Sequence, residues 1–315
     1  MKNCIFKDLD CRVAFGGASI SGEGKGYGFG KINEQEAIDL LNLAYNQGLK
    51  LFDTAPIYGF GLSEKRMGKA FKNKREKIKI VSKSGVSWHD NGRVNMTNDP
   101  GTTQKMLEQS LRDLQSDYID LYMIHWPDEK VDIRKPMEVL SRAKDEGKIL
   151  SIGLCNTYPE DFIRAQEVDK VEVIQSELNP FNQYTLETLL PLCEKEELTF
   201  MGWGTLDKGI LTKRVNEKRS YDSEDCRSWA PWWDKEEVKK KVLALGEVFK
   251  YLDKNEVTGL EFALGFSQLR SRDGFSLVGA KSIEQLTSLM KAYKNLPEDK
   301  IIEQAIEILY KNYER

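Results

Sequence analysis

Four residues that carry charge or exchange protons stand at or just past the ends of short apolar segments. They are an acid, a phenol, an amine and an imidazole: Asp53, Tyr58, Lys83 and His125. Together such groups can fix a charge and move one proton to or from a reacting atom. A single Tyr or Lys after a strand is often structural, so the functional hypothesis requires all four to meet at one place.

The apolar segments themselves predict the architecture. They are nearly continuous rather than alternating, which is typical of strands buried on both faces, and helical patterns separate them. Strand and helix alternate eight times, which predicts an α/β fold: a closed (β/α)8 TIM barrel, one domain over residues 1–315, with long βα loops. The carboxyl ends of barrel strands converge on one face, so the four residues would converge there. The segments are 12–16, 49–54, 78–83, 119–125, 149–156, 171–175, 198–203 and 275–279.

Two long segments interrupt this rhythm. Residues 19–32 are rich in glycine, but these glycines are spaced GxGxGxG and do not match the dinucleotide fingerprint GxGxxG. Residues 206–234 precede an extra helix predicted over 235–252. Both segments follow strands, so both should overhang the active face. We expect the polar stretch 213–228 to be solvated and mobile, and the tryptophans that follow it, Trp229, Trp232 and Trp233, to cover the cleft.

Composition excludes several other classes of function. The net charge of −3, with Lys and Arg spread along the chain, gives no sign of a nucleic-acid partner. We expect no membrane span, because no apolar run approaches the roughly 18 residues required. The five cysteines show no CxxC spacing, which favours reduced thiols and a cytoplasmic location. With only two histidines, a catalytic metal site is not expected.

The four residues suggest a specific chemistry. Lys83 beside Tyr58 would stabilise a phenolate and lower the tyrosine pKa from its usual value of about 10. Asp53 would hold Lys83 charged, and His125 could donate a hydrogen bond to a substrate oxygen that Tyr58 then protonates. Such a site needs an electron-pair donor, and a hydride from a nicotinamide would serve.

Four sequence blocks resemble the signatures of the aldo-keto reductases. They are FDTAPIYGFGLSE (52–64), VSKSG (81–85), DYIDLYMIHWPD (117–128) and GKILSIGLCN (147–156), in the family's order within residues 11–292. The resemblance implies a (β/α)8 barrel that reduces aldehydes and ketones with NADPH. It also implies that Asp53, Tyr58, Lys83 and His125 form the catalytic tetrad.

The same resemblance implies a cofactor site. Cys155-Asn156 stands where the family has a Ser-Asn pair for the nicotinamide carboxamide, and Trp203 stands where an aromatic ring stacks on the nicotinamide. WGTLDKGILTK (203–213) resembles the loop over the pyrophosphate, and VGAKSIEQL (278–286) resembles the adenosine side. Lys281 would meet a 2′-phosphate, which favours NADPH and leaves NADH possible. The expected cofactor-binding residues are Gly17, Ala18, Cys155, Asn156, Gln175, Trp203, Gly204, Leu206, Gly209, Leu211, Gly279, Lys281 and Gln285.

Tryptophans are expected to line the substrate pocket, because all six follow predicted strands. Besides Trp203, these are Trp88, Trp126, Trp229, Trp232 and Trp233. Such walls suit a small-molecule carbonyl that is aromatic or sugar-like, although Trp88 could equally anchor a loop. The leading hypothesis is a carbonyl reductase. The alternatives are a non-catalytic NADPH-binding regulatory subunit and a sugar or alcohol dehydrogenase working in the oxidative direction.

Overall fold

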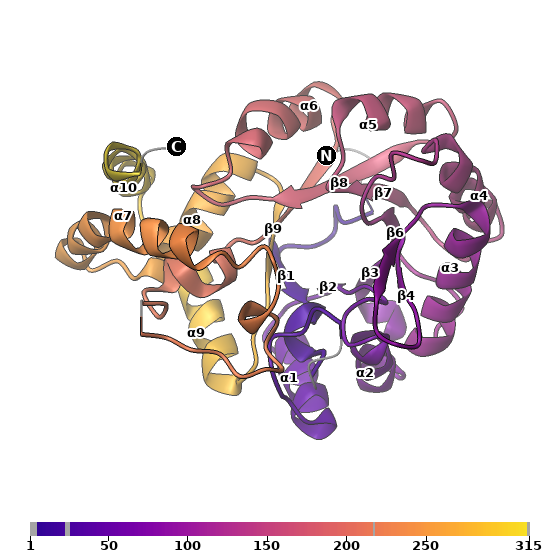
Figure 1. The fold of residues 1–315 in the computed structure, drawn as a ribbon, viewed down its shortest axis with the longest axis horizontal. Helices are drawn as coiled ribbons and strands as arrows, with labels where there is room; N and C mark the ends of the chain where they lie inside the picture. The colour runs from indigo at the N-terminus through magenta and orange to yellow at the C-terminus, as the bar shows by residue number, and fades with distance from the viewer. Residues whose placement is uncertain (1–4, 23–25, 217, 314–315) are drawn as a thin grey trace.

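The predicted barrel is confirmed. The computed structural model describes residues 5–22, 26–216 and 218–313, so Cys4 and residues 23–25 of the glycine-rich segment lie outside it. Eight parallel strands close into a barrel in the order β1-β10-β9-β8-β7-β6-β3-β2 (Figure 1). They are β1 (Val13–Gly16), β2 (Leu51–Asp53), β3 (Lys79–Ser84), β6 (Leu121–Ile124), β7 (Ile152–Cys155), β8 (Val171–Glu177), β9 (Thr199–Trp203) and β10 (Phe275–Val278).

Helices surround the barrel, and their ends follow local sequence signals. The first helix begins with a capping box in which Asn33 and Glu36 satisfy each other's backbone N–H groups. The last helix packs against the two that precede β10, at the left of Figure 1. The helices are α1 (Glu34–Asn46), α2 (Leu62–Phe71), α3 (Pro100–Leu114), α4 (Arg134–Asp145), α5 (Pro159–Gln166), α6 (Leu190–Lys195), α7 (Lys235–Lys254), α8 (Gly259–Ser271), α9 (Ile283–Lys294) and α10 (Asp299–Asn312).

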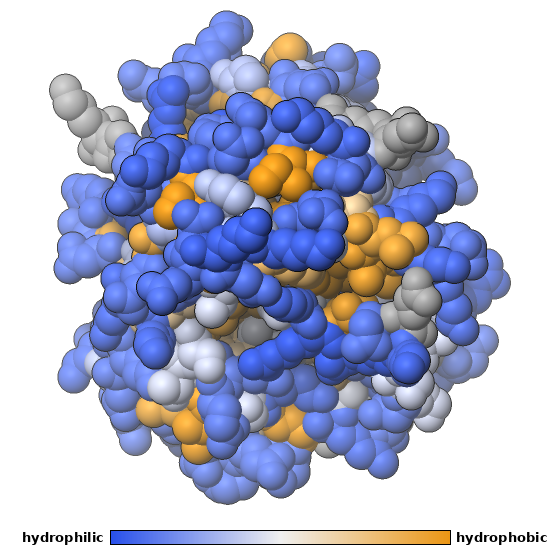
Figure 2. Space-filling model, turned by 90° about the vertical axis from the view of Figure 1, so that its left-hand side faces the viewer, coloured by the Kyte–Doolittle hydropathy of each residue, from blue (hydrophilic) through white to orange (hydrophobic). Residues whose placement is uncertain are grey.

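Two apolar cores account for the continuous hydrophobicity of the strands. Alternate side chains point into the barrel, where Leu51, Val81 and Met123 pack together. Their strand neighbours point outward and pack under the helices. Phe6 lies edge-on to Phe275, with ring centroids 5.5 Å apart, and belongs to the inner core. The outer face over α7 and α10 is mostly hydrophilic, with apolar side chains in separate patches (Figure 2).

A small hairpin after β3 was not expected from the sequence. Strands β4 (Val86–Trp88) and β5 (Val94–Met96) pair antiparallel outside the barrel sheet. Each of these two hairpin strands is only three residues long. A period-two pattern over three residues cannot be distinguished from a loop. Trp88, expected in the loop after a strand, therefore lies inside a strand.

Candidate active site

Every second side chain of a barrel strand points inward, and at the carboxyl ends of three strands these inward side chains are polar. Asp53 lies two residues beyond Leu51, and Lys83 lies two residues beyond Val81, so each follows an apolar residue that also faces the barrel interior. His125 follows Met123 in the same way just past the end of β6. Three strands therefore deliver an acid, an amine and an imidazole to one face.

An ion pair lies at the base of this site. The Nζ atom of Lys83 donates to both carboxylate oxygens of Asp53, at 2.7 and 2.8 Å, and to the carbonyl of Thr54 at 3.0 Å. Lys83 is fully buried, and burial alone would lower its pKa. The adjacent Asp53 carboxylate outweighs that effect and raises the pKa, so Lys83 stays protonated.

Tyr58 lies close to both Lys83 and His125. The Lys83 Nζ atom is 5.5 Å from the centroid of the Tyr58 ring. The Tyr58 and His125 rings meet edge to face, with centroids 6.1 Å apart. The structure thus brings the four expected catalytic residues together.

The expected direction of the Tyr58 pKa is wrong for this structure. Burial of the hydroxyl raises the pKa of Tyr58 to about 12, although the Lys83 ammonium acts in the lowering direction. Desolvation exceeds the Coulomb attraction because the Lys83 charge is shared with Asp53. Burial and the nearby Lys83 also hold the pKa of His125 well below its usual value, so its imidazole is neutral.

Polar side chains from the next strands extend the site. Gln175 Nε2 donates to Asp53 at 2.8 Å, and the Cys155 thiol donates to Gln175 Oε1 at 3.3 Å. Burial raises the pKa of Cys155 to about 12, so it is a thiol rather than a thiolate. Trp203 Nε1 donates to Asn156 Oδ1 at 3.0 Å, and Asn156 Nδ2 donates to the His125 carbonyl at 3.0 Å.

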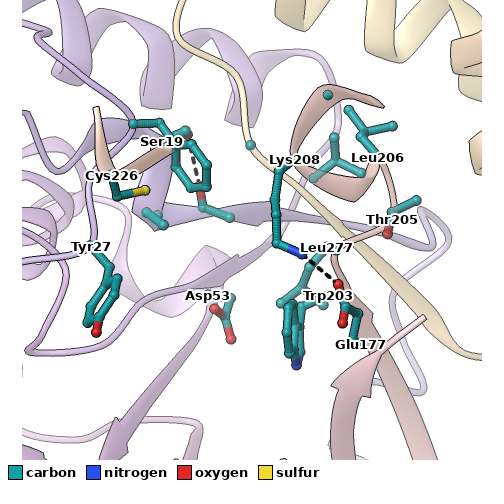
Figure 3. A pocket seen from close by; sticks show the side chains of 18 of the residues that line it. Ser19, Tyr27, Asp53, Glu177, Trp203, Thr205, Leu206, Lys208, Cys226 and Leu277 are labelled. Atoms are coloured by element: carbon teal, nitrogen blue, oxygen red, sulfur yellow. Dashed lines mark hydrogen bonds and ion pairs between the residues drawn. The ribbon is translucent and has the colours of Figure 1, made fainter. Parts of the chain in front are cut away.

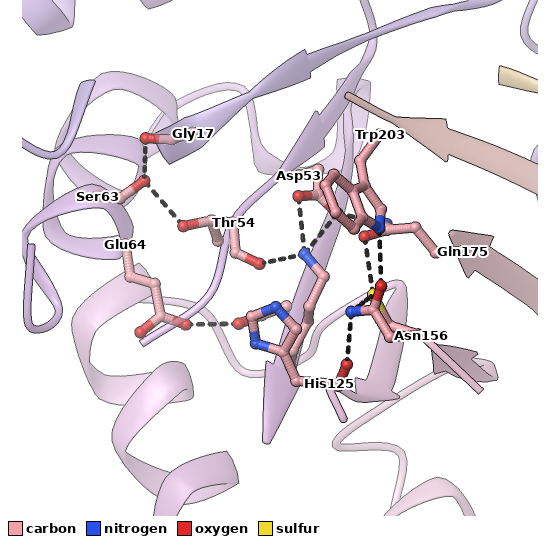
Figure 4. A network of polar contacts seen from close by, with 12 residues as sticks. Gly17, Asp53, Thr54, Ser63, Glu64, His125, Asn156, Gln175 and Trp203 are labelled. Carbon is pink, nitrogen blue, oxygen red and sulfur yellow. Dashed lines mark hydrogen bonds and ion pairs between the residues drawn. The ribbon is translucent and has the colours of Figure 1, made fainter. Parts of the chain in front are cut away.

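A second hydrogen-bonded path reaches Gly17, the residue after β1 (Figure 4). Thr54 Oγ1 donates to Ser63 Oγ at 2.8 Å, and Ser63 donates to the Gly17 carbonyl at 3.0 Å. A side chain at Gly17 would place its Cβ 2.5 Å from Ser63 Oγ and 2.7 Å from the Asp53 carbonyl. Glycine is therefore required here, and the Lys83 contact at Thr54 is linked to the loop after β1.

A cleft of about 1160 Å³ opens over these residues. Figure 3 shows Tyr27 and Cys226 on one side and Glu177, Lys208 and Trp203 on the other. Lys83 lies beneath its floor. Of the residues expected from the sequence, those that line the cleft are Gly17, Ala18, Asp53, Tyr58, His125, Trp126, Cys155, Asn156, Gln175, Trp203, Gly204, Leu206, Gly209, Gly279, Lys281, Gln285 and Trp232.

Four residues that the sequence places at the cleft do not line it in the described part of the chain. Leu211 is fully buried in the outer core, and Trp233 packs against the same core. Trp88 stacks on Phe60, with ring centroids 4.7 Å apart. Trp229 lies against Tyr27, with centroids 5.6 Å apart. These three tryptophans therefore pack on the core or on other aromatic rings and do not line the cleft.

The two long loops meet across the cleft. Phe29 and Asp225 form an antiparallel bridge, and the Cys226 N–H donates to the Gly28 carbonyl at 2.9 Å. The sequence predicts that the stretch 213–228 is solvated, but Asp225 and Cys226 within it are buried. Backbone pairing with the glycine-rich segment accounts for the difference.

Several cationic side chains line the cleft. Arg227 lies near Lys281, and Arg214, Arg219 and Lys291 also belong to the lining. The Lys281 ammonium donates to the Phe29 carbonyl. Burial, together with the nearby Arg227, lowers the pKa of Lys281 despite Asp225. Lys281 is thus already engaged by the glycine-rich segment.

Sequence reasoning missed several lining residues. Tyr27 lines the cleft from the glycine-rich segment, and Val94 and Met96 line it from the hairpin. Lys208 pairs with Glu177 at 2.8 Å, and both line the cleft. Glu177 follows Gln175 by two residues on β8, and this same-face spacing was the available signal.

Across the described ranges, no group of three or more His, Cys, Asp or Glu side chains is placed to hold a metal ion. In the same part of the chain, no helix has the length and apolar character that crossing a bilayer requires.

Comparisons with known proteins agree with the fold. The model of the Aldo/keto reductase family matches residues 12–308. The chain is 34% identical over 224 residues to Aldo-keto reductase YhdN of Bacillus subtilis, covering 70% of this chain and 67% of that protein. It is 30% identical over 226 residues to the NADH-specific methylglyoxal reductase of Escherichia coli, covering 68% and 69%. The solved glycerol dehydrogenase AKR11B4 from Gluconobacter oxydans superposes with a TM-score of 0.84 at 29% identity, covering 97% of this chain and 94% of that one. The chain therefore belongs to the aldo/keto reductase family, whose members are oxidoreductases.

Proposed function

We propose that the protein reduces an aldehyde or ketone to an alcohol, with Tyr58 as the proton donor. The observation that carries the proposal is the position of Tyr58 at the cleft, between the Lys83 ammonium below and the His125 ring beside it. A neutral imidazole can donate one hydrogen bond to a carbonyl oxygen. The Tyr58 hydroxyl can then give its proton to that oxygen as negative charge develops.

Lys83 and Asp53 act on Tyr58 rather than on the substrate. The ammonium favours the phenolate that remains after proton transfer, and the carboxylate keeps the ammonium protonated and in place. Because Asp53 also accepts from Gln175, its two oxygens are held in a fixed orientation.

A nicotinamide cofactor, NADP(H) with NAD(H) as an alternative, supplies the hydride when bound. Asn156, Gln175 and Cys155 offer carboxamide and thiol partners beside the Trp203 ring, which suits a flat ring bearing an amide. The cationic side chains at the other end, Lys281 and Arg227 among them, suit phosphate groups. NAD(H) remains an alternative because the Escherichia coli relative is named as NADH-specific.

Tyr58→Phe tests the proposal, because it keeps the ring and removes the proton. We expect the rate of aldehyde reduction to fall by roughly 100-fold or more, with the affinity for NADPH nearly intact. A variant that reduces aldehydes at the wild-type rate would refute the role of Tyr58.

A second candidate is oxidation of an alcohol in the cell, favoured by the glycerol dehydrogenase match. It uses the same residues in reverse, with the Tyr58 phenolate as base. The non-catalytic NADPH-binding subunit has no comparable support, because the chain belongs to a family of oxidoreductases. Rates in both directions with purified protein separate reduction from oxidation.

A further inference from the structure

The hairpin β4–β5 has one apolar face. In its ladder Val86 lies opposite Met96, and Trp88 lies opposite Val94. Side chains alternate along a strand, so these four share one face, while Ser87 and its partner Asn95 share the other. A hairpin with an apolar face gains stability only if something covers that face.

Part of the apolar face is covered by the segment that carries Tyr58. Val86 is buried in a small cluster with Ile57, against which Tyr58 and Trp88 pack. Trp88 is covered by its stack on Phe60, two residues after Tyr58. The hairpin is thus built against the catalytic tyrosine.

The rest of the apolar face is open to the cleft. Val94 and Met96 line the cleft, and Met96 is 52% exposed. Trp126, which directly follows His125, lines the same cleft and is 39% exposed. Large apolar side chains exposed in a concave site beside a catalytic group are typical of a ligand-binding wall.

The base of the hairpin is rigid, so the wall keeps its shape. The Thr97 N–H donates to the Gly85 carbonyl at 3.0 Å, and Asn98 Nδ2 donates to the Trp126 carbonyl at 2.7 Å. Gly85 has φ +97°, and a Cβ there would come within 2.3 Å of Asn98 Oδ1. Asn98 therefore holds the hairpin and Trp126 in one fixed arrangement.

We propose that this hairpin wall, formed by Val86, Val94, Met96 and Trp126, selects carbonyl substrates with an extended alkyl or aryl substituent. The proposal rests on the proposed reduction at Tyr58 and names its substrate class. A polyhydroxylated substituent would lose hydrogen bonds to water against this wall without replacement. The charged side chains Glu177 and Lys208 also line the cleft, but they are paired with each other at 2.8 Å (Figure 3).

The test compares kcat/KM for a series of straight-chain aldehydes from propanal to heptanal, with glyceraldehyde as the hydroxylated probe. Each methylene buried on the wall should raise kcat/KM by about two- to fourfold in the wild type. Met96→Lys should lower the heptanal-to-propanal ratio by about tenfold or more. Asn95→Lys is the matched control, because it adds the same charge one residue away on the polar face, and it should leave the ratio unchanged.

Val94→Thr provides a second variant that keeps the β-branched shape and should lower the same ratio more modestly. A ratio near one in the wild type, a preference for glyceraldehyde, or equal loss for both aldehydes in Met96→Lys would overturn the proposal. Binding of 1-alkanols, followed by tryptophan fluorescence, separates this failure from failure of the proposed function. A protein that reduces no aldehyde but binds longer alkanols more tightly has the wall without the chemistry. Reduction with no dependence on chain length shows the reverse.

Discussion

Glu64 should make the stability of this protein depend on pH in an unusual direction. It lies on α2, fully buried behind β3, and its Oε1 accepts from Ser82 Oγ at 2.7 Å. Burial raises its pKa to about 7, even though the hydrogen bond from Ser82 acts in the lowering direction. The perturbation is Glu64→Gln, which keeps the shape and removes the titration.

The magnitude follows from the difference between the folded and unfolded pKa values. Unfolded Glu64 has a pKa of 4.5 and folded Glu64 one of about 7, so between these values the native state holds one more proton. The stabilisation from this proton is complete below pH 4.5 and is lost as the pH rises through 7. The free energy of unfolding therefore falls by about 1.4 kcal/mol per pH unit in that window, or about 3 kcal/mol in all.

The assay is urea unfolding of both proteins at several values between pH 5 and pH 8.5. We expect Glu64→Gln to gain stability relative to the wild type as the pH rises, because only unfolding of the wild type releases the Glu64 proton in that range. Glu76→Gln provides the control, since it makes the same Glu-to-Gln change at an exposed position. Parallel curves for the wild type and Glu64→Gln would refute the reasoning, because they would show that Glu64 keeps its charge when buried.

Three further predictions concern the site. In Lys83→Met the pH profile for alcohol oxidation should shift to higher pH, because the ammonium that lowers the Tyr58 pKa is gone; an unchanged profile at normal rates would make Lys83 merely structural. Lys281→Met should weaken NADPH binding by roughly 10- to 100-fold and leave NADH binding unchanged, as titrations of both cofactors would show; equal weakening would assign Lys281 to loop closure alone. Binding of cofactor or substrate should increase protection from hydrogen exchange in the described part of 213–233, and equal, high protection in every state would exclude a lid.

The barrel could be predicted because its strands are buried on both faces, which leaves a continuous apolar pattern in the sequence. The convergence of the site could be predicted for a related reason. On β2 and β3 the inward face changes from Leu51 and Val81 to Asp53 and Lys83 within two residues. A polar residue at the carboxyl end of an otherwise apolar face indicates a functional side chain rather than a loop.

The walls of the cleft could not be predicted in the same way. The hairpin strands are short, and their apolar face depends on Phe60 and Tyr58, which come from a different loop. The roles of the tryptophans depend on such partners too: Trp88 and Trp126 both follow barrel strands, yet only Trp126 lines the cleft. The position of a tryptophan in the sequence indicates on which face of the barrel it lies. The side chains that it contacts determine whether its ring lines the cleft.

The same limit applies to the electrostatics, where the sequence predicts neighbours but not burial. Lys83 beside Tyr58 implies a lowered tyrosine pKa, yet the Asp53 carboxylate draws on the same ammonium and the phenol is desolvated. The balance favours a protonated Tyr58 at neutral pH, which is the state that a general acid requires. Under the proposed mechanism, reduction therefore starts from the resting form of the site. Oxidation must first remove the Tyr58 proton, so its rate should rise with pH well above neutrality.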